Sequence, residues 1–433
     1  MGNVPVREQI APGVWFTSIT DPKFKLNRIS VNLAVPLRDE TAAENAIVPY
    51  LLRKGCREYP DIASLNSRMA ELYGAYLDGE MRKHGGNQIL NLSVQALDDR
   101  FALENEDMIG ECVKLLCQVL FDPKLVGEDE VAFDPEDVTT ERQYLVDTID
   151  SLINDKRSYA IDHCVKSMCV GQPAAVSRYG THEQAEALTP ADAMRAYRRV
   201  LKTAHVEILF IGCGNPASAI ASFKEAFASV EREPQELVKM LPRLKADEVN
   251  RITEKMDVVQ GKLVMGFRVG DVSDRRDYNA LRMMLAVYGG TPFSRLFRYV
   301  REKLSLCYYC ASRYDRSTGI MLVDSGVEFD KKEAAEAEIL NQLEVMRKGE
   351  FTEEEFAAAR LSLVSAMEAA GDSLGVLEGY YFNQIFIGGD RTPAQEIEDI
   401  SKITREDIIE AARRVTLDTV YFLKGQEGCS DEA

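Results

Sequence analysis

Apolar residues at every second position predict half-buried antiparallel strands in the first part of the chain. The stretch 29–35 places Ile29, Val31 and the apolar residues that follow on one face, and small or polar residues on the other. The stretch 90–96 repeats this alternation after a Gly85-Gly86 pair, which is typical of a turn. Both stretches are therefore predicted to be strands.

Helical periodicity separates these strands and dominates several later segments. Apolar residues recur every three or four positions after Pro60-Asp61, which has the composition of a helix start. The acidic cluster Glu353–Glu355 is expected to be a solvated helix face. Helices and strands alternate in irregular blocks, which favours an α+β fold over a doubly wound sheet. The longer helical patterns cover about 137–168, 334–347 and 353–370.

The second half of the chain repeats patterns of the first half in the same order, which predicts a duplicated domain. In each half an early strand is followed by a helix containing an Asn-Ala pair, and a capped helix near the end leads into an apolar strand. The expected organisation is an N-terminal domain at 1–230, a Pro- and charge-containing linker at 231–250 and a C-terminal domain at 251–433. The matching segments are 28–35 with 262–269, 188–200 with 403–415, and 206–212 with 420–425.

Charge and composition exclude several classes of partner. The 433 residues include 52 Lys and Arg against 70 Asp and Glu, a formal net charge of −18, which argues against nucleic-acid and anionic-membrane partners. There is neither a cationic and apolar leader nor a run of ~18 apolar residues. Nine cysteines, an odd count in a long chain, fit reduced thiols. We expect a soluble, cytoplasmic protein.

Only four histidines are available for a metal site. A hydrolytic zinc site needs about three nitrogen or carboxylate ligands. The nearest approach to H-E-x-x-H is the run His182-Glu-Gln-Ala-Glu186, in which Glu186 stands where the second histidine belongs. His84 flanks the predicted turn and is expected to be solvated, and His163-Cys164 falls in a helical region where buried, inert cysteine is more common. None of these positions is predicted to bind metal.

Cys307 and Cys310 form a C-x-x-C pair, a spacing used in zinc knuckles and redox sites. The stretch 306–313 is predicted to be a strand, and residues three apart on a strand face opposite sides. The two sulfurs are therefore not expected to converge. The sequence also lacks the glycine-rich phosphate loops and the G-x-S-x-G motif that would indicate a nucleotide site or a serine hydrolase.

The segment 289–308 combines a glycine pair, the run Ser294-Arg-Leu-Phe, and Arg301 and Tyr308 seven positions apart. It resembles the C-terminal-half signature of the insulinase (pitrilysin) family, and the two similar halves, the linker and the total length extend this resemblance over the whole chain. The resemblance implies a mitochondrial-processing-peptidase-like fold: two homologous α+β domains in a clamshell arrangement, each an antiparallel sheet packed with helices. It also implies that Arg301 holds substrate carbonyls and that Tyr308 donates to the developing oxyanion, which makes them the expected catalytic residues.

The zinc half of the family's active site is degenerate in this chain. The family carries H-x-x-E-H on the first helix of the N-terminal half, shortly before a Lys-Gly pair. Here Lys54-Gly55 is present, but Ala46, Pro49 and Tyr50 stand where the two histidines and the general base belong. The family's third ligand, a glutamate, aligns near Thr148. We therefore expect no zinc and no cofactor in this chain.

The resemblance implies a zinc-less subunit that is inactive alone and shares an active site with a zinc-bearing partner carrying H-x-x-E-H. The expected substrate is a peptide or an unfolded polypeptide segment. Within the family the chain resembles zinc-less members encoded beside a zinc-bearing relative in Gram-positive bacteria, which are associated with modification of elongation factor P.

Two alternatives stay open at this point. In the first alternative, the chain is an inactive homologue with a binding or scaffolding role, and Arg301 and Tyr308 are retained as packing residues. Alternatively, it is a metallopeptidase on its own, with ligands that the motifs do not reveal, which the scarcity of histidine disfavours.

Overall fold

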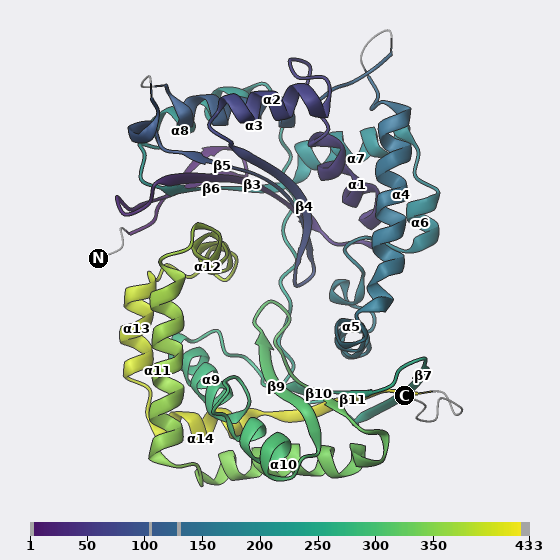
Figure 1. Cartoon of the computed structure of the whole chain (residues 1–433), viewed down its shortest axis with the longest axis vertical. Coiled ribbons are helices and arrows are strands. Elements are labelled where there is room, and N and C mark those ends of the chain that lie inside the picture. The colour runs from purple at the N-terminus through teal and green to yellow at the C-terminus, as the bar shows by residue number, and fades with distance from the viewer. Residues whose placement is uncertain (1–3, 104–105, 128–130, 426–433) are drawn as a thin grey trace. The chain divides into compact units, whose positions relative to one another are not determined.

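The computed structural model describes residues 4–103, 106–127 and 131–425, which form two compact units that are not continuous along the chain (Figure 1). Each unit is a β-sheet packed with helices, as the sequence predicts for an α+β protein. The first unit comprises Met1–Asp150, Val176–Lys239 and Ala370–Thr392, and the second comprises Ser151–Ala175, Met240–Ala369 and Pro393–Ala433.

The sheet of the first unit has six strands in the order β1-β2-β6-β3-β5-β4. Neighbouring strands are antiparallel except β2 and β6, which are parallel. The two stretches predicted as strands pair directly, because β3 runs antiparallel to β5 along its whole length. The bounds are β1 (Val6–Ala11), β2 (Val14–Thr20), β3 (Leu26–Pro36), β4 (Tyr76–His84), β5 (Asn87–Leu97) and β6 (His205–Gly212).

The sheet of the second unit has five strands in the order β7-β11-β8-β10-β9, which is the order of the first sheet without its outermost strand β1. Here too one pair, β7 and β11, is parallel and the other pairs are antiparallel. The repeat in the sequence thus corresponds to a repeated topology, and each sheet is mixed where a purely antiparallel one was expected. The bounds are β7 (Asn250–Met256), β8 (Gly261–Arg268), β9 (Cys307–Asp315), β10 (Ile320–Val327) and β11 (Thr416–Gly425).

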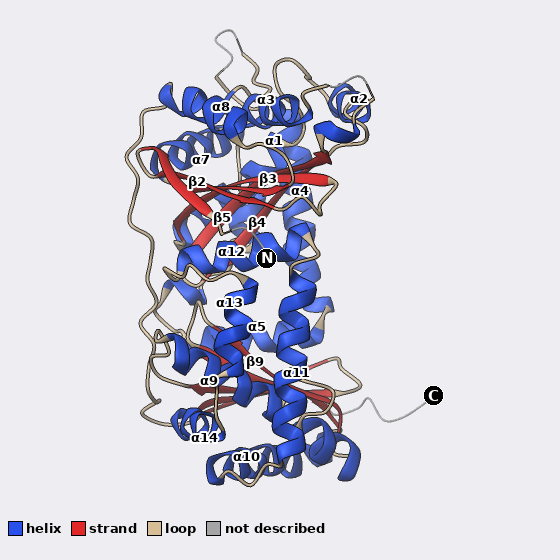
Figure 2. Ribbon diagram, turned by 90° about the vertical axis from the view of Figure 1, so that its left-hand side faces the viewer, coloured by secondary structure: helices blue, strands red, loops and turns tan. Residues whose placement is uncertain are grey.

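Helices cover the sheet of each unit, as the blue ribbons around the red strands show (Figure 2). In the first unit they are α1 (Ala42–Leu52), α2 (Ile62–Glu71), α3 (Met108–Phe121), α4 (Pro135–Ser151), α6 (His182–Glu186), α7 (Pro190–Thr203), α8 (Ala217–Ala228) and α12 (Leu374–Phe386). In the second they are α5 (Lys156–Met168), α9 (Arg275–Tyr288), α10 (Lys332–Lys348), α11 (Glu353–Ala370), α13 (Pro393–Ser401), α14 (Arg405–Arg414) and a π-helical segment, η5 (Leu296–Lys303).

The repeated helices that lead into the last strand of each unit begin with the same cap. Thr189 caps α7 by accepting from the backbone N–H of Asp192, and Thr404 caps α14 by accepting from that of Asp407. In both caps the aspartate side chain bonds back to the threonine, which forms a reciprocal capping box. The capped helices predicted from the repeat are confirmed.

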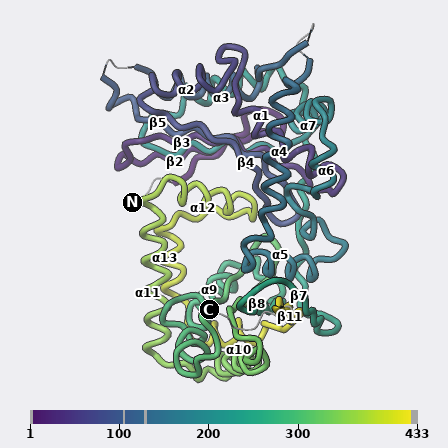
Figure 3. Tube along the Cα trace, turned by 45° about the vertical axis from the view of Figure 1, so that its right-hand side comes forward, coloured from purple at the N-terminus to yellow at the C-terminus, as the bar shows by residue number. Residues whose placement is uncertain are grey.

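Helix α12 comes from the second half of the sequence but packs on the sheet of the first unit, next to β6 and β3 (Figure 3). Its apolar residues, among them Leu377 and Phe382, share a core cluster with Leu209 and Ile211 of β6. The carboxylate of Glu378, also on α12, is buried and pairs with Arg28 of β3. Both apolar contact and an ion pair therefore hold α12 on this sheet.

Helix α5 shows the converse arrangement. It follows α4 of the first unit in sequence, but it packs on β8 and β11 of the second unit. The helical stretch predicted over about 137–168 is present, but it is divided into separate helices. Helix α4 ends at Ser151, and Asp155 then caps α5 by accepting from the backbone N–H groups of Arg157 and Ser158, each at 3.1 Å. The boundaries expected along the chain, 1–230, 231–250 and 251–433, do not include this exchange of α5 and α12.

Candidate functional site

Arg301 and Tyr308 lie on two consecutive elements of the second unit, η5 and β9. Arg301 is in the last turn of η5, and Tyr308 is the second residue of β9, an edge strand of the sheet. The Arg301 guanidinium lies over the ring of Phe297, 4.5 Å from its centroid, and Tyr308 is 60% exposed. Within residues 4–103, 106–127 and 131–425 neither side chain makes a hydrogen bond or an ion pair, so both present their polar groups to solvent.

A β-bulge at Tyr308 accounts for its exposure. In the pairing of β9 with β10, Tyr309 lies opposite Gly326 and Cys307 lies opposite Val327, so Tyr308 has no partner in the register. An extra residue of this kind locally reverses the alternation of faces and re-aims a side chain. The bulge therefore turns Tyr308 outward at the end of the strand.

The same bulge brings Cys307 and Cys310 to one side of the strand, where both contact the same apolar core. The Cys310 thiol hydrogen-bonds Cys307 and lowers the pKa of the Cys307 thiol below its usual value. The Ser325 hydroxyl and the positive charge of Arg301 act in the same direction. The prediction that the two sulfurs would not converge was wrong, because it assumed regular alternation. Gly326, inside a strand, was the available signal for a bulge.

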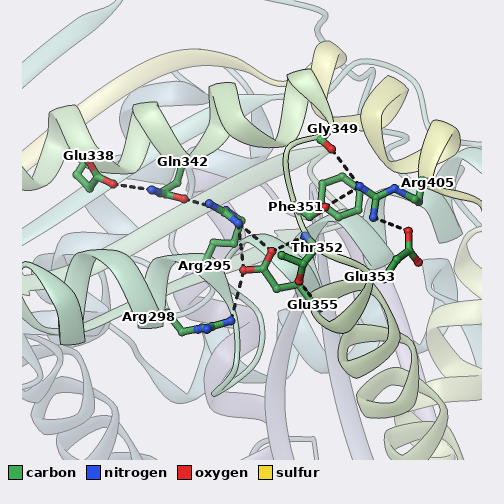
Figure 4. A network of polar contacts seen from close by, with 10 residues as sticks. All are labelled: Arg295, Arg298, Glu338, Gln342, Gly349, Phe351, Thr352, Glu353, Glu355 and Arg405. Atoms are coloured by element: carbon green, nitrogen blue, oxygen red, sulfur yellow. Dashed lines mark hydrogen bonds and ion pairs between the residues drawn. The ribbon is translucent and has the colours of Figure 1, made fainter.

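Arg295 of the Ser-Arg-Leu-Phe run is a buried structural residue (Figure 4). Its Nη1 lies 2.8 Å from Oε2 of Glu355, and its Nε donates to Oε1 of Gln342 at 2.8 Å. The expectation that Glu353–Glu355 is a solvated face was wrong for Glu355, which is buried, whereas Glu353 is exposed and pairs with Arg405 at 2.9 Å. The charge pattern alone does not predict the burial of Glu355, because that burial depends on its ion pair with Arg295.

The ion pair fixes the beginning of η5. Arg295 is the residue before the first turn of η5, and Glu355 lies in the first turn of α11. Glu355 is itself held by a reciprocal cap, since its carboxylate accepts from the backbone N–H of Thr352 at 2.9 Å and its own N–H donates to Oγ1 of Thr352 at 3.1 Å. The segment η5, which carries Arg301 in its last turn, is thus anchored to two neighbouring helices, α10 through Gln342 and α11 through Glu355.

Helix α1 of the first unit carries the positions of the degenerate zinc motif. Ala46 is fully buried, and Tyr50 is buried with its ring 5.5 Å from that of Tyr144 in an edge-to-face arrangement. The Arg53 guanidinium lies 5.1 Å from the Tyr50 ring centroid. Burial, followed by the charge and hydrogen bond of Tyr179, raises the pKa of Tyr50 far above its usual value. Aromatic packing occupies the place where a metal would need ligands.

The remaining parts of that motif have structural roles. Thr148, where the third ligand was expected, donates its hydroxyl to the backbone carbonyl of Tyr144 at 2.8 Å. Lys54 pairs with the buried Glu141 at 2.8 Å. A Cβ at Gly55 would lie 2.5 Å from the carbonyl oxygen of Tyr59, so a close backbone approach requires glycine there. These residues do not fit a zinc ion.

No group of three or more His, Cys, Asp or Glu side chains with metal-binding geometry occurs in the described part of the chain. His182 is paired with Asp150 at 2.8 Å on the surface of α6, and His163 stacks on Tyr159 at 3.8 Å. His84 was expected to be merely solvated, but its ring packs 4.7 Å from that of Phe386 on α12. His205 bonds the buried Glu207 at 2.7 Å. Each histidine therefore has a local structural partner.

Comparison with known proteins agrees with this geometry. Residues 187–363 match the family described as "Peptidase M16 inactive domain". The "Probable inactive metalloprotease YmfF" of Bacillus subtilis is 27% identical over 411 residues, which cover 94% of this chain and 95% of that protein. The chain is similar to the insulinase (M16) family of peptidases. The matched family model and the Bacillus subtilis relative are both described as inactive, and in this chain Ala46 and Tyr50 stand at two of the ligand positions, so the chain resembles an inactive peptidase homologue.

Solved structures extend the comparison over the whole fold. A conserved protein from Enterococcus faecalis V583 superposes with a TM-score of 0.89 at 26% identity, covering 99% of this chain and 100% of that one. A peptidase M16 inactive domain from Pseudomonas fluorescens gives 0.78 at 15% identity, covering 99% and 100%. Both have the insulinase-type fold found here. Among the described helices, none has the length and apolar character needed to cross a bilayer.

Proposed function

We propose that this chain is the zinc-less subunit of a two-chain insulinase-type peptidase. In this proposal Arg301 and Tyr308 act on a peptide bound at the zinc site of a partner subunit that carries H-x-x-E-H. The main supporting observation is that Tyr308 is 60% exposed, on a bulge that turns it outward. A residue retained only for packing would be buried, as Arg295 is a few positions earlier.

The chemistry of the two side chains suits this role. The partner's metal would polarise the scissile carbonyl and activate a water molecule. Arg301 can donate several hydrogen bonds to the backbone carbonyls of an extended peptide, because its guanidinium carries five donors in a fixed plane. Tyr308 can donate its hydroxyl to the oxygen on which negative charge develops. A donor of this kind contributes roughly 10²–10³ in kcat.

Affinity purification of the tagged chain from its native host, at near-physiological salt, is the first test. A stoichiometric relative with an intact H-x-x-E-H supports the proposal. Recovery of the chain alone, or with unrelated proteins, contradicts it. The association with elongation factor P modification stays a prediction until such a complex and its substrate are known.

Peptidase assays on the reconstituted pair test the role of Tyr308. Tyr308→Phe should lower kcat roughly 10²–10³-fold while leaving assembly intact. Tyr76→Phe is the matched control, because Tyr76 is also 60% exposed and also lies on an edge strand, β4 of the first unit. Full activity of the Tyr308→Phe complex would contradict the proposal and favour the alternative, in which the chain is a binding or scaffolding homologue.

A further inference from the structure

The Cys307/Cys310 pair has no part in the proposed function, yet its surroundings differ from those of the other cysteines. Burial raises the pKa of Cys112, Cys117 and Cys164 to about 12, which is typical of inert core thiols. Cys307 is half-buried, and its pKa is lowered by the hydrogen bond from Cys310. Cys307 is therefore the more accessible and more readily ionised member of the pair.

The two members of the pair are differently exposed. Cys310 is 5% exposed and belongs to the apolar core of the second unit, whereas Cys307 packs at the margin of that core. The hydrogen bond to Cys307, followed by burial, keeps the pKa of Cys310 well above its usual value. An external reagent thus reaches Cys307 first, and Cys310 is shielded until Cys307 has reacted.

The backbone around Cys307 is suited to closing a short disulfide. Cys307 is the first residue of β9, which pairs with only one strand, and the bulge interrupts that pairing at Tyr308. Ser305, two residues earlier, has a φ of +48°, so the chain turns sharply into the strand. Cys307 lies opposite Val327 and Cys310 opposite Ser325, so the bulge brings the two cysteines to a spacing of two strand positions, roughly 6.8 Å at ~3.4 Å each, near the upper end of the ~4.4–6.8 Å between Cα atoms that a disulfide needs.

We propose that Cys307 and Cys310 are a redox-active dithiol that closes to an intrachain disulfide on reaction with a low-molecular-weight disulfide. The Cys307 thiolate attacks one sulfur of the reagent, forms a mixed disulfide and expels the first thiolate. Cys310 then loses its proton and attacks Sγ of Cys307, expelling the second thiolate. Two electrons and the two thiol protons pass to the reagent, which becomes two thiols. The resulting ring contains Tyr308 and fixes the bulge.

Trypsin releases a peptide that reports directly on this reaction. Cleavage after Lys303 and Arg313 gives residues 304–313, which contain Cys307, Cys310 and no other cysteine. The folded chain is treated with oxidised glutathione and its remaining thiols are alkylated. After digestion, the mass of the peptide is measured by mass spectrometry. The expected product is lighter by two hydrogen atoms, carries no alkyl group and is restored by dithiothreitol. A doubly alkylated peptide, or a glutathione adduct that persists in the native chain, would overturn the proposal.

Variants assign the two roles. Cys310→Ala should accumulate the glutathione adduct on Cys307, whereas Cys307→Ser should leave Cys310 unmodified. Cys213→Ser is the control, because Cys213 is also half-buried but lies in the first unit, and it should leave the disulfide unchanged. Arg301→Gln should slow adduct formation roughly two- to fivefold, since a nearby cation favours the thiolate. Equal reactivity of Cys307 and Cys310 in these variants would contradict the assignment.

Discussion

Arg295 and Glu355 form an ion pair inside the second unit, with Nη1 and Oε2 2.8 Å apart and both residues 5% exposed. A buried pair of this kind is costly to break, because removal of one partner leaves an uncompensated charge in the core. The pair also sets the start of η5, which carries Arg301 in its last turn. Its integrity therefore matters for both the stability of the unit and the placement of the exposed arginine.

Glu355→Gln should lower the free energy of unfolding by about 3–5 kcal/mol, because Arg295 keeps its charge without a carboxylate. Urea denaturation of the whole chain measures the loss. Glu353→Gln, in the same turn of α11, removes an exposed pair with Arg405 and should cost no more than ~1 kcal/mol. Equal costs for the two variants would contradict the structural role given to Arg295.

The exchanged helix α12 offers a second test. Glu378→Gln should cost about 3–5 kcal/mol, because Arg28 would lose its buried partner. In the Glu378→Gln variant, the backbone amides of α12 should exchange faster than those of neighbouring helices, because this ion pair holds α12 on a sheet that is far from it in sequence. Asp372→Asn is the control, because Asp372 is 78% exposed in its pair with Lys23 and should contribute ~1 kcal/mol or less. Unchanged exchange in α12 would show that apolar contacts alone retain it.

The sequence determines the sheets well, because their signals are local. Alternation in 29–35 and 90–96 predicts two strands that pair in the structure. The repeated caps at Thr189 and Thr404 predict equivalent helices in the two units. Each of these inferences uses residues a few positions apart, which is the range over which propensity and capping act.

Features that depend on contacts between residues far apart in the sequence could not be predicted from local patterns. Apolar spacing marks α5 and α12 as helices but cannot tell which sheet each one covers. The burial of Glu355 depends on Arg295, 60 positions earlier. The convergence of Cys307 and Cys310 depends on a bulge that only the pairing with β10 reveals. The degenerate zinc motif could be predicted as a loss of ligands, but the aromatic packing of Tyr50 with Tyr144 could not.

The packing around Tyr50 predicts that α1 is stable without metal. Treatment with EDTA should leave the thermal midpoint unchanged, because Tyr50 stands at a ligand position and packs against Tyr144 and Arg53. Tyr50→Ala should cost about 3–5 kcal/mol, and a double-mutant cycle with Tyr144→Ala should give a coupling of about 0.5–1.5 kcal/mol. A large fall in the midpoint with EDTA, restored by zinc, would show that a metal site exists after all.

The capping box of α7 predicts a defined pH dependence. The Thr189 hydroxyl donates to Asp192 at 2.7 Å and lowers the pKa of that carboxyl below its usual value. Because the folded pKa is the lower one, the contribution of Asp192 to stability is fully present above its unfolded pKa of about 3.9 and is lost as the pH falls through the folded value.

Asp192→Asn should therefore lower the free energy of unfolding by about 1 kcal/mol at pH 7 and by progressively less below pH 4. Urea denaturation of both proteins across that range measures the difference. The exposed Asp247→Asn variant is the control and should follow the parent chain at every pH. A cost for Asp192→Asn that stays constant down to pH 3 would mean that the ionised carboxylate is not what stabilises the cap.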